Sequence, residues 1–220
     1  TGASRGIGYE LTKQFAANPQ YTVFLLSRNA KQLEQLKQEC QSMYTSSNIV
    51  PVPCDLSDEQ SLISGIKTIL KQASTIDLLV NNAGAILNKP FTTIKRAELE
   101  YVYNVNVFSV IRLIQECLPA MNGKQRVHIV NISSIGGVQG SVKFAGLSAY
   151  SSSKAALVCI TECLAEELRE KNISINCLAL GAVQTEMLEE AFPGYKAPVS
   201  AYEMAVFIAG FCLNAHKMMN

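Results

Sequence analysis

Short, continuous apolar runs alternate with longer amphipathic stretches along the chain. The apolar runs are rich in Val, Ile and Leu, as in strands of a parallel sheet that is covered on both faces. Strands are predicted at Thr22–Leu26, Ile49–Pro53, Leu78–Val80, Val127–Ile132 and Ile173–Cys177. Apolar residues at helical spacing predict helices at Gly6–Ala17, Lys31–Gln41, Glu59–Gln72, Glu98–Met121, Ser152–Glu170 and Ala201–Leu213.

This alternation predicts an α/β fold with a doubly wound parallel sheet of the Rossmann-like kind and right-handed crossovers. No low-complexity linker or internal repeat interrupts the pattern, so residues 1–220 are expected to form a single domain. Such a sheet needs a central strand before the helix at Gly6–Ala17, yet the chain opens on Thr1. We therefore expect the first strand to be clipped from the sequence, and a last edge strand to follow Asn220.

Composition and charge narrow the class of partner. The chain is 48% hydrophobic and 17% charged, which is enough apolar material for a sizeable core. Its net charge is +1 and no cluster of Lys and Arg occurs, so neither a nucleic acid nor an anionic membrane surface is expected as a partner. No apolar run approaches the roughly 18 residues of a membrane span. A small molecule or a matching protein surface is favoured as the partner.

Cysteine and histidine usage points to a reducing compartment without a metal site. The seven cysteines are odd in number, lack a CxxC motif and lie in apolar segments, so they are interpreted as buried thiols of a cytoplasmic protein. The two histidines, His128 and His216, have no ligand-like spacing to each other or to cysteine. We expect no bound metal.

Polar residues and glycine follow the predicted strands at the points where the strands end. Because ligands of open α/β sheets bind outside the carboxyl ends of the strands, these positions predict a common site. They are Ser27 and Arg28, Asp55, Asn81 and Asn82, Ser133 and Ser134, and Gly181.

The stretch TGASRGIG, Thr1 to Gly8, is glycine-rich and opens a predicted helix. Such a turn lets the backbone approach a phosphate and directs free N–H groups and the helix dipole at it. The alternative is an ordinary tight turn.

The stretch YSSSK places Tyr150 and Lys154 one helical turn apart. A tyrosine has an ordinary pKa near 10, and a neighbouring cation favours its phenolate, so Lys154 is expected to lower the pKa of Tyr150 toward neutrality. Taken alone, the pair could also be two solvated side chains on a helix surface.

Together with NNAG (Asn81–Gly84) and NISS (Asn131–Ser134), these stretches occur in an order that resembles the short-chain dehydrogenase/reductase family over nearly the whole chain. The resemblance implies that Tyr150 gives a proton to the substrate oxygen while the nicotinamide gives hydride to the carbon. It also implies that Lys154 holds the ribose hydroxyls of the cofactor.

The remaining catalytic candidates are a serine and an asparagine. Either Ser133 or Ser134 could donate to the carbonyl oxygen as charge develops there, and analogy with the family selects Ser134. The resemblance matches Asn106 in NVNVFSV to an asparagine that kinks a helix and holds a water in the proton path, with Asn104 as the alternative. The segment between Ser134 and Tyr150 is longer than is usual in the family.

Asp55 could accept a hydrogen bond from the adenine amino group, or it could be a helix N-cap, a role that Ser57 would fill equally well. Asn82, Ala83 and Gly84 would surround the adenosine ribose. The cofactor-binding candidates are Gly2, Ser4, Arg5, Gly6, Ile7, Gly8, Ser27, Arg28, Asp55, Leu56, Asn82, Ala83, Gly84, Tyr150, Lys154, Gly181, Val183 and Thr185.

Arg28 decides the expected cofactor. A site that prefers NAD carries an acidic residue near the end of the second strand, whereas NADP requires a cation for its 2′-phosphate. The sequence there is LLSRN, without an acid, and Arg5 supplies a second cation. The alternative is two solvated arginines. NADP(H) is therefore predicted.

LGAVQTEM, Leu180 to Met187, resembles the segment that fixes the nicotinamide carboxamide in the family, through Val183 and Thr185, although Leu180 replaces the usual proline. Residues 187–198 are expected to form a mobile, mainly apolar lid.

The sequence thus predicts an NADPH-dependent carbonyl reductase that acts as a homodimer or homotetramer by resemblance. A catalytically silent NADP(H)-binding or sensing protein, a 3-oxoacyl reductase and an NAD-linked alcohol dehydrogenase remain open. The sequence does not name the substrate.

Overall fold

The computed structural model describes residues 1–122 and 126–215. The chain divides into two compact units. The first contains residues 1–73 and 182–213, and the second contains residues 74–181 and the described residues after 213. The single domain over residues 1–220 stays a prediction.

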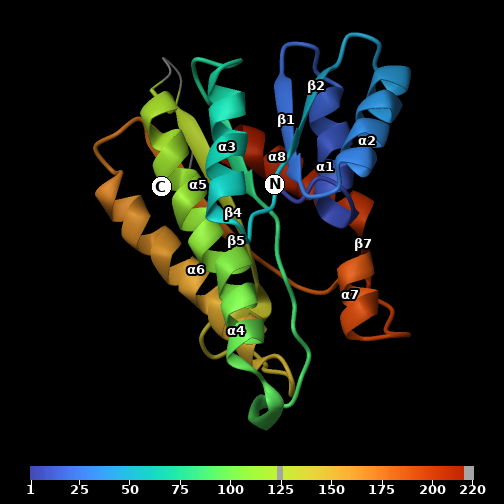
Figure 1. Ribbon diagram of the computed structural model, residues 1–220, viewed down its shortest axis with the longest axis vertical. Coiled ribbons are helices and arrows are strands. Elements are labelled where there is room, and N and C mark those ends of the chain that lie inside the picture. The colour runs from blue at the N-terminus through green and yellow to red at the C-terminus, as the bar shows by residue number, and fades with distance from the viewer. Residues whose placement is uncertain (123–125, 216–220) are drawn as a thin grey trace. The chain divides into compact units, whose positions relative to one another are not determined.

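The first unit contains the glycine-rich turn at the start of the sequence. Strand β1 pairs with β2 in parallel, and α1 and α2 pack against these strands (Figure 1). Prolines 51 and 53 cannot donate to a ladder, which suits β2 to a sheet edge. Its elements are α1 (Gly6–Ala16), β1 (Thr22–Ser27), α2 (Ala30–Met43), β2 (Asn48–Pro53), α3 (Glu59–Leu70), β6 (Val183–Gln184), α7 (Glu186–Ala191), β7 (Val199–Ser200) and α8 (Ala201–Asn214).

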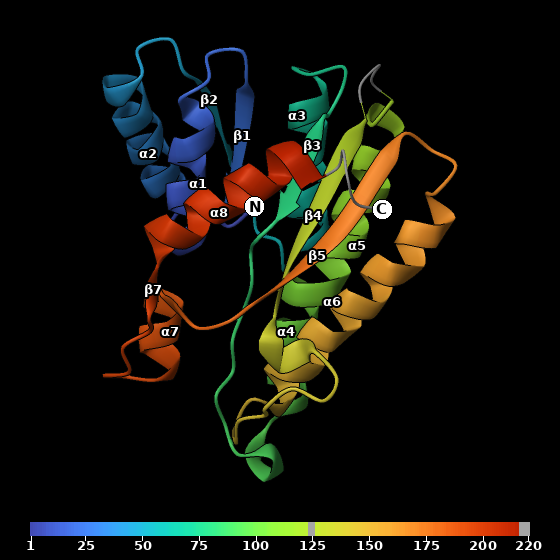
Figure 2. The same cartoon turned by 180° about the vertical axis from the view of Figure 1, so that it is seen from behind.

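The second unit is built on a parallel sheet with the order β3-β4-β5. Helix α6 packs along β4 and β5 (Figure 2). Residues 127–133 of β4 are all buried, as expected of a central parallel strand with both faces covered. The elements are β3 (Leu78–Asn81), α4 (Arg96–Tyr103), a π-helical turn (Asn104–Phe108), α5 (Ser109–Cys117), β4 (Val127–Ser134), α6 (Ser148–Glu167) and β5 (Ile173–Leu180), with short 3₁₀ turns at 91–93, 118–120 and 135–137.

The predicted strands are all present, and each extends one to three residues further than its predicted apolar run. The single helix predicted over Glu98–Met121 was wrong, because a π-helical turn and a 3₁₀ turn divide it. The helix predicted from Ser152 begins earlier, at Ser148, and therefore includes Tyr150. The sequence pattern missed α7, β6 and β7, which are short.

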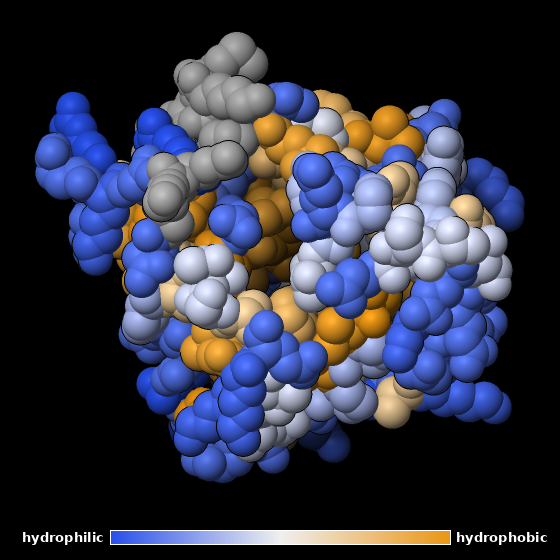
Figure 3. Space-filling model, turned by 90° about the horizontal axis from the view of Figure 1, so that it is seen from above, coloured by the Kyte–Doolittle hydropathy of each residue, from blue (hydrophilic) through white to orange (hydrophobic). Residues whose placement is uncertain are grey.

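Leucine and isoleucine side chains fill the interior of each unit. In the first unit Leu25, Leu33 and Leu36 are almost completely buried, and in the second unit Ile129 and Leu157 are as well. Some apolar residues remain exposed among the hydrophilic majority on the face seen in Figure 3. No helix within residues 1–122 and 126–215 is long and apolar enough to cross a membrane.

All the cysteines are free thiols. The prediction that they are all buried was wrong, because Cys159 and Cys163 are exposed on α6 and Cys177 is partly exposed. Burial raises the pKa of Cys117 and of Cys212 to about 12, because it disfavours the thiolate. The buried thiols are Cys40, Cys54, Cys117 and Cys212.

Candidate active site

Helix α6 carries Tyr150 and Lys154 on one face. The Lys154 Nζ lies 6.0 Å from the centre of the Tyr150 ring and donates a hydrogen bond of 2.8 Å to the carbonyl oxygen of Ile132 at the end of β4. Only 4% of Lys154 is exposed, and this burial lowers the pKa of its ammonium from 10.5 to about 8. A negative charge on Cys177 would act in the opposite direction. Lys154 is therefore a buried cation that can exchange a proton near neutral pH.

Tyr150 is half-buried and shares a side-chain hydrogen bond with Ser134. Burial raises the pKa of the Tyr150 phenol, and this effect is larger than the lowering by the hydrogen bond with Ser134. The expectation that Lys154 lowers the pKa of Tyr150 was wrong for this arrangement. The phenol is therefore protonated at neutral pH, which suits a proton donor.

Ser133 and Ser134 have different partners because side chains alternate along a strand. Ser133 is buried and donates a hydrogen bond of 2.8 Å to the main-chain oxygen of Lys154, so it fastens α6 to β4. Ser134 is half-buried, and its Oγ accepts a 3.2 Å hydrogen bond from the Gly136 N–H. The structure brings Ser134, and not Ser133, against the Tyr150 side chain.

Asn106 lies in the π-helical turn between α4 and α5 and is completely buried. Its Nδ2 donates to the Ala85 oxygen and to Ser153 Oγ, both at 2.9 Å, and its Oδ1 accepts from the Ala85 N–H at 2.7 Å. Asn104, the alternative, is half-exposed. Asn106 therefore joins the loop after β3 to α6, and π-helical turns often occur at functional sites.

The loop after β3 contains Asn82, Ala83 and Gly84. A Cβ built on Gly84 would lie 3.5 Å from Lys154 Nζ and 3.4 Å from Asn106 Oδ1, so the absence of a side chain lets this backbone pack against both groups. The structure thus brings Gly84 together with Lys154 and Asn106.

Side-chain hydrogen bonds also fix the strand ends of this unit. Asn81 Nδ2 donates to Asn131 Oδ1 at 2.8 Å, and Asn131 Nδ2 donates to Thr161 Oγ1 of α6 at 2.9 Å.

Gly137 follows β4 at a point where a Cβ would lie 2.6 Å from the main-chain carbon of Lys154. This close approach sets the depth at which α6 packs, and sequence reasoning missed Gly137.

The glycine-rich turn lies in the first unit. Gly2 and Gly6 have φ values of 69° and 57°, which favour glycine, and the Gly2 N–H donates to the Leu26 oxygen at 2.8 Å. Ser27 donates to Ser4 through their hydroxyls at 2.7 Å. The turn is thus tied to the end of β1.

Helix α1 starts at Gly6, continues through Ile7 and the buried Gly8, and has no side-chain hydrogen bond at its N-cap residue, Arg5. Its N-cap residue therefore gives the first N–H groups no side-chain cap, and Gly2 and Gly6 are partly exposed. These features fit a phosphate group of a dinucleotide.

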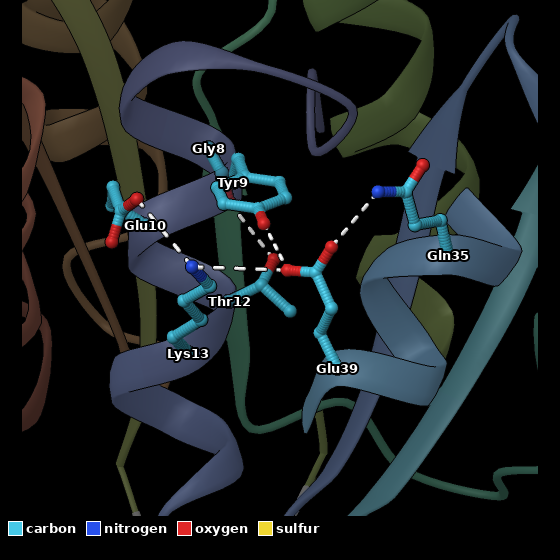
Figure 4. A network of polar contacts seen from close by, with 7 residues as sticks. All are labelled: Gly8, Tyr9, Glu10, Thr12, Lys13, Gln35 and Glu39. Atoms are coloured by element: carbon cyan, nitrogen blue, oxygen red, sulfur yellow. Dashed lines mark hydrogen bonds and ion pairs between the residues drawn. The ribbon is translucent and has the colours of Figure 1, made fainter. Parts of the chain in front are cut away.

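A polar network joins the start of α1 to α2 (Figure 4). The Tyr9 hydroxyl donates to Glu39, and Gln35 Nε2 donates to Glu39 at 3.0 Å. Lys13 Nζ lies 3.9 Å from Glu39 and 4.2 Å from the centre of the Tyr9 ring. The hydrogen bond from Tyr9 lowers the pKa of Glu39. This network sets the position of α1, and therefore of the glycine-rich turn, against α2.

The two candidate cations of the cofactor site have different surroundings. Arg28 is exposed at the end of β1, just before the Asn29 N-cap of α2. Arg5 forms an ion pair with Glu190 of α7. Sequence reasoning missed Glu190, because nothing in the local pattern signals a contact between residues so far apart in the chain.

Asp55 follows β2 and accepts hydrogen bonds from the main chain and the hydroxyl of Ser57, at 2.9 and 2.7 Å. The N-cap of α3 is Asp58, so the alternative of Asp55 or Ser57 as that N-cap was wrong. Leu56 is buried beside them. A role of Asp55 toward adenine stays a prediction.

Val183 is buried in β6, and Thr185 is the N-cap of α7, accepting a 3.3 Å hydrogen bond from the Leu188 N–H. Gly181, after β5, is exposed. The predicted lid, 187–198, includes most of α7, which carries Glu189 and Glu190 and is less apolar than expected.

The candidate residues thus form two groups. Asn106, Ser134, Tyr150 and Lys154 come together in the second unit, with Gly84 beside them. The glycine-rich turn, both arginines and Thr185 belong to the first unit. Their roles toward a cofactor stay predictions.

No group of at least three His, Cys, Asp or Glu residues that could hold a metal occurs among the described residues. His128 is buried and bonds to Asn176 at 2.8 Å, and His216 lies outside the described residues. The expectation of a metal-free site stays a prediction.

Comparison with known proteins gives consistent matches. The family model described as short chain dehydrogenase matches residues 1–196. The chain is 33% identical over 190 residues to a protein named fatty acyl-CoA reductase from Acinetobacter baylyi, which covers 86% of this chain and 62% of that protein. It is 30% identical over 206 residues to 3-oxoacyl-(acyl-carrier-protein) reductase FabG from Thermotoga maritima, covering 94% and 79%.

A solved structure of a metagenomic short-chain oxidoreductase in complex with NADP superimposes with a TM-score of 0.83 at 27% identity, covering 100% of this chain and 91% of that one. This similarity confirms the predicted α/β fold with parallel strands. The chain spans only 62% of the length of the fatty acyl-CoA reductase.

Proposed function

We propose that this chain, which belongs to the short-chain dehydrogenase/reductase family, is an NADPH-dependent reductase. It would transfer hydride to the carbonyl carbon of a ketone or aldehyde. Tyr150 would be the proton donor. The observation that carries this proposal is the grouping of Ser134, Tyr150 and Lys154 where β4 meets α6.

The protonation state of Tyr150 suits reduction of the substrate. Burial raises the pKa of its phenol, so the hydroxyl keeps its proton at neutral pH. A protonated phenol is ready to donate to an oxygen that gains negative charge, whereas oxidation of an alcohol would need it to accept a proton first. The resting state of Tyr150 is therefore the one that the proposed reduction needs.

The other residues assist the same proton transfer. The Ser134 hydroxyl would donate a second hydrogen bond to the carbonyl oxygen, which stabilises developing charge. Lys154, with a pKa of about 8, would return a proton to Tyr150 after each turnover. Asn106 holds the loop at Ala85 against α6, and we propose that this contact supports the proton path. A bound nicotinamide would supply the hydride.

We propose NADP(H) as the cofactor because the end of β1 carries Arg28 and no acid, and because a similar solved structure is a complex with NADP. The glycine-rich turn would hold its phosphates. Gly84, which has no side chain, would leave room for the cofactor beside Lys154. Replacement of Arg28 by Asp should move the preference toward NAD.

The substrate is proposed only as a carbonyl class. Relatives are named as reductases of fatty acyl-CoA and of 3-oxoacyl-acyl-carrier protein, so acyl thioesters stand beside simple ketones as candidates. We propose a cytoplasmic location and a homodimer or homotetramer from the free thiols and the family. The alternative class is a silent NADP(H)-binding protein.

The test is NADPH oxidation by the purified chain against a panel of ketones, diketones, fatty acyl-CoA and 3-oxoacyl thioesters. Tyr150→Phe should bind NADPH as tightly as the wild type but lose turnover by about 100-fold or more, as expected for a general acid. Tyr202→Phe, on the exposed surface of α8, is the matched control and should keep full activity. Ordinary rates in Tyr150→Phe would refute the assignment, and NADPH binding without turnover of any panel member would favour the silent protein.

A further inference from the structure

Helix α7 packs on the glycine-rich turn within the first unit. A Cβ built on Gly6 would lie 3.4 Å from Glu186 Oε2 and 3.4 Å from Thr185 Cγ2. The start of α7 and a carboxylate therefore face the turn that we propose binds cofactor phosphates. The Glu190 side chain, four residues after Glu186 in α7, also reaches this glycine-rich segment, at Arg5.

Arg5 and Glu190 make a two-pronged ion pair. Arg5 Nη1 donates to Glu190 Oε1, and Nη2 donates to Oε2 at 3.2 Å. Planar guanidinium groups bind carboxylates and phosphates through the same pair of parallel hydrogen bonds. The two Arg5 nitrogens that could bind a phosphate thus already donate to a carboxylate.

The charges around Arg5 favour the cation and oppose an incoming anion. The pairing with Glu190 raises the pKa of Arg5 and lowers that of Glu190, and Glu186 also acts on Arg5. The Arg5 and Glu190 side chains are 43% and 59% exposed, so water screens the pair and keeps it weak enough to exchange. A 2′-phosphate carries almost two negative charges and would be repelled by both carboxylates.

We propose that Glu190 is a specificity-determining residue, which competes with the 2′-phosphate of NADP(H) for the guanidinium of Arg5. This inference rests on the proposed function. It implies that the chain binds NADPH less tightly than its arginines alone would allow, and that binding of the 2′-phosphate frees α7 from one of its contacts with the glycine-rich turn.

The expected effect follows from the strength of exposed ion pairs. Such pairs contribute up to about 1 kcal/mol, which corresponds to about a fivefold change in a dissociation constant. Glu190→Gln keeps the size of the side chain and removes its charge. We therefore expect it to tighten NADPH binding by about two- to fivefold.

The experiment measures equilibrium dissociation constants of the full chain for NADPH and NADH, and for adenosine 2′,5′-bisphosphate and 5′-AMP, by calorimetry or fluorescence. The matched control is Glu189→Gln, on the same helix with the same charge change, where the carboxylate accepts a hydrogen bond from the Gly194 N–H instead of from Arg5. Glu190→Gln should tighten the two ligands that carry a 2′-phosphate relative to the control. Binding of NADH and 5′-AMP should match the control.

A double-mutant cycle identifies the partner of Glu190. In an Arg5→Ala background the gain from Glu190→Gln should disappear, which a general effect on stability would not produce. Equal NADPH affinity of the Glu190→Gln and Glu189→Gln chains, or a gain that persists without Arg5, overturns this inference while leaving the reductase proposal intact. If the wild-type chain does not bind NADPH, both the proposed cofactor and this inference are wrong.

Discussion

Replacement of Lys154 by Met tests the burial of a cation at the centre of the candidate site. Met has a similar length and no charge, so it removes the ammonium without leaving a large cavity. It also removes the hydrogen bond to the Ile132 oxygen, which costs about 1 kcal/mol at any pH. The charge, by contrast, changes the free energy of unfolding by an amount that depends on pH, because the folded chain holds the ammonium proton less tightly than the unfolded chain does.

The magnitude follows from the pKa of Lys154, which falls from 10.5 to about 8 on folding. Between these values the folded protein holds fewer protons than the unfolded chain, so this group makes folding more favourable as pH rises through that window. Each pKa unit is worth about 1.4 kcal/mol, so the cost of burying the ammonium is about 3 kcal/mol at pH 7. It falls to about 2 kcal/mol at pH 9 and to less than about 1 kcal/mol at pH 10.

The assay is urea unfolding of both proteins at pH 7, 8, 9 and 10. Lys154→Met should be more stable than the wild type at pH 7, and its advantage should shrink by about 2 to 3 kcal/mol by pH 10. The difference between the two proteins cancels the titration of their shared cysteines and tyrosines. Lys171→Met, at an exposed position after α6, is the control and should show no such trend.

A stability difference that stays constant from pH 7 to pH 10 would refute the reasoning. It would mean that the Lys154 ammonium keeps its ordinary pKa in the folded protein. The proposal that this lysine returns protons near neutral pH would then lose its physical basis.

Two further predictions concern packing and thiol exposure. Gly137→Ala should destabilise the chain by about 1 to 3 kcal/mol in urea unfolding, because its Cβ would overlap the α6 backbone. The control, Gly210→Ala, has open space on α8 and should be neutral or stabilising. Equal stabilities of the two variants would contradict the close contact at Gly137. In the native protein, iodoacetamide followed by peptide mass spectrometry should label Cys159 and Cys163 quickly and the buried thiols slowly. Uniform labelling would contradict the burial pattern.

The apolar pattern predicted the strands but not where they end, and β4 shows why. Its apolar run stops at Ile132, yet the strand continues to Ser134. Asn131 and Ser133 can be buried there because their side chains bond to Thr161 and to the Lys154 oxygen on α6. Polar residues that are satisfied by a distant helix give no local signal, so the sequence alone ends the strand too early.

In the candidate site, too, the sequence predicted the residues but not the effects of distant contacts. Motif order was sufficient to select Ser134, Tyr150 and Lys154, which the structure brings together. The direction of the Tyr150 pKa shift could not be predicted, because it depends on how deeply α6 buries the phenol. The partner of Arg5 could not be predicted either, because Glu190 meets it only through the folding of the chain.

The hydrogen bonds of Asn106 have an evolutionary consequence. The Asn106 side chain bonds to both main-chain polar groups of Ala85 and to the hydroxyl of Ser153. These three residues come from separate parts of the sequence. A substitution of Asn106 leaves both main-chain groups of Ala85 without this partner, and a substitution of Ser153 leaves an Nδ2 hydrogen of Asn106 unpaired, whereas the main-chain groups of Ala85 do not depend on its side chain. Epistasis is therefore expected between positions 106 and 153, whose side chains bond to each other, and variants of this chain should change these two positions jointly or not at all.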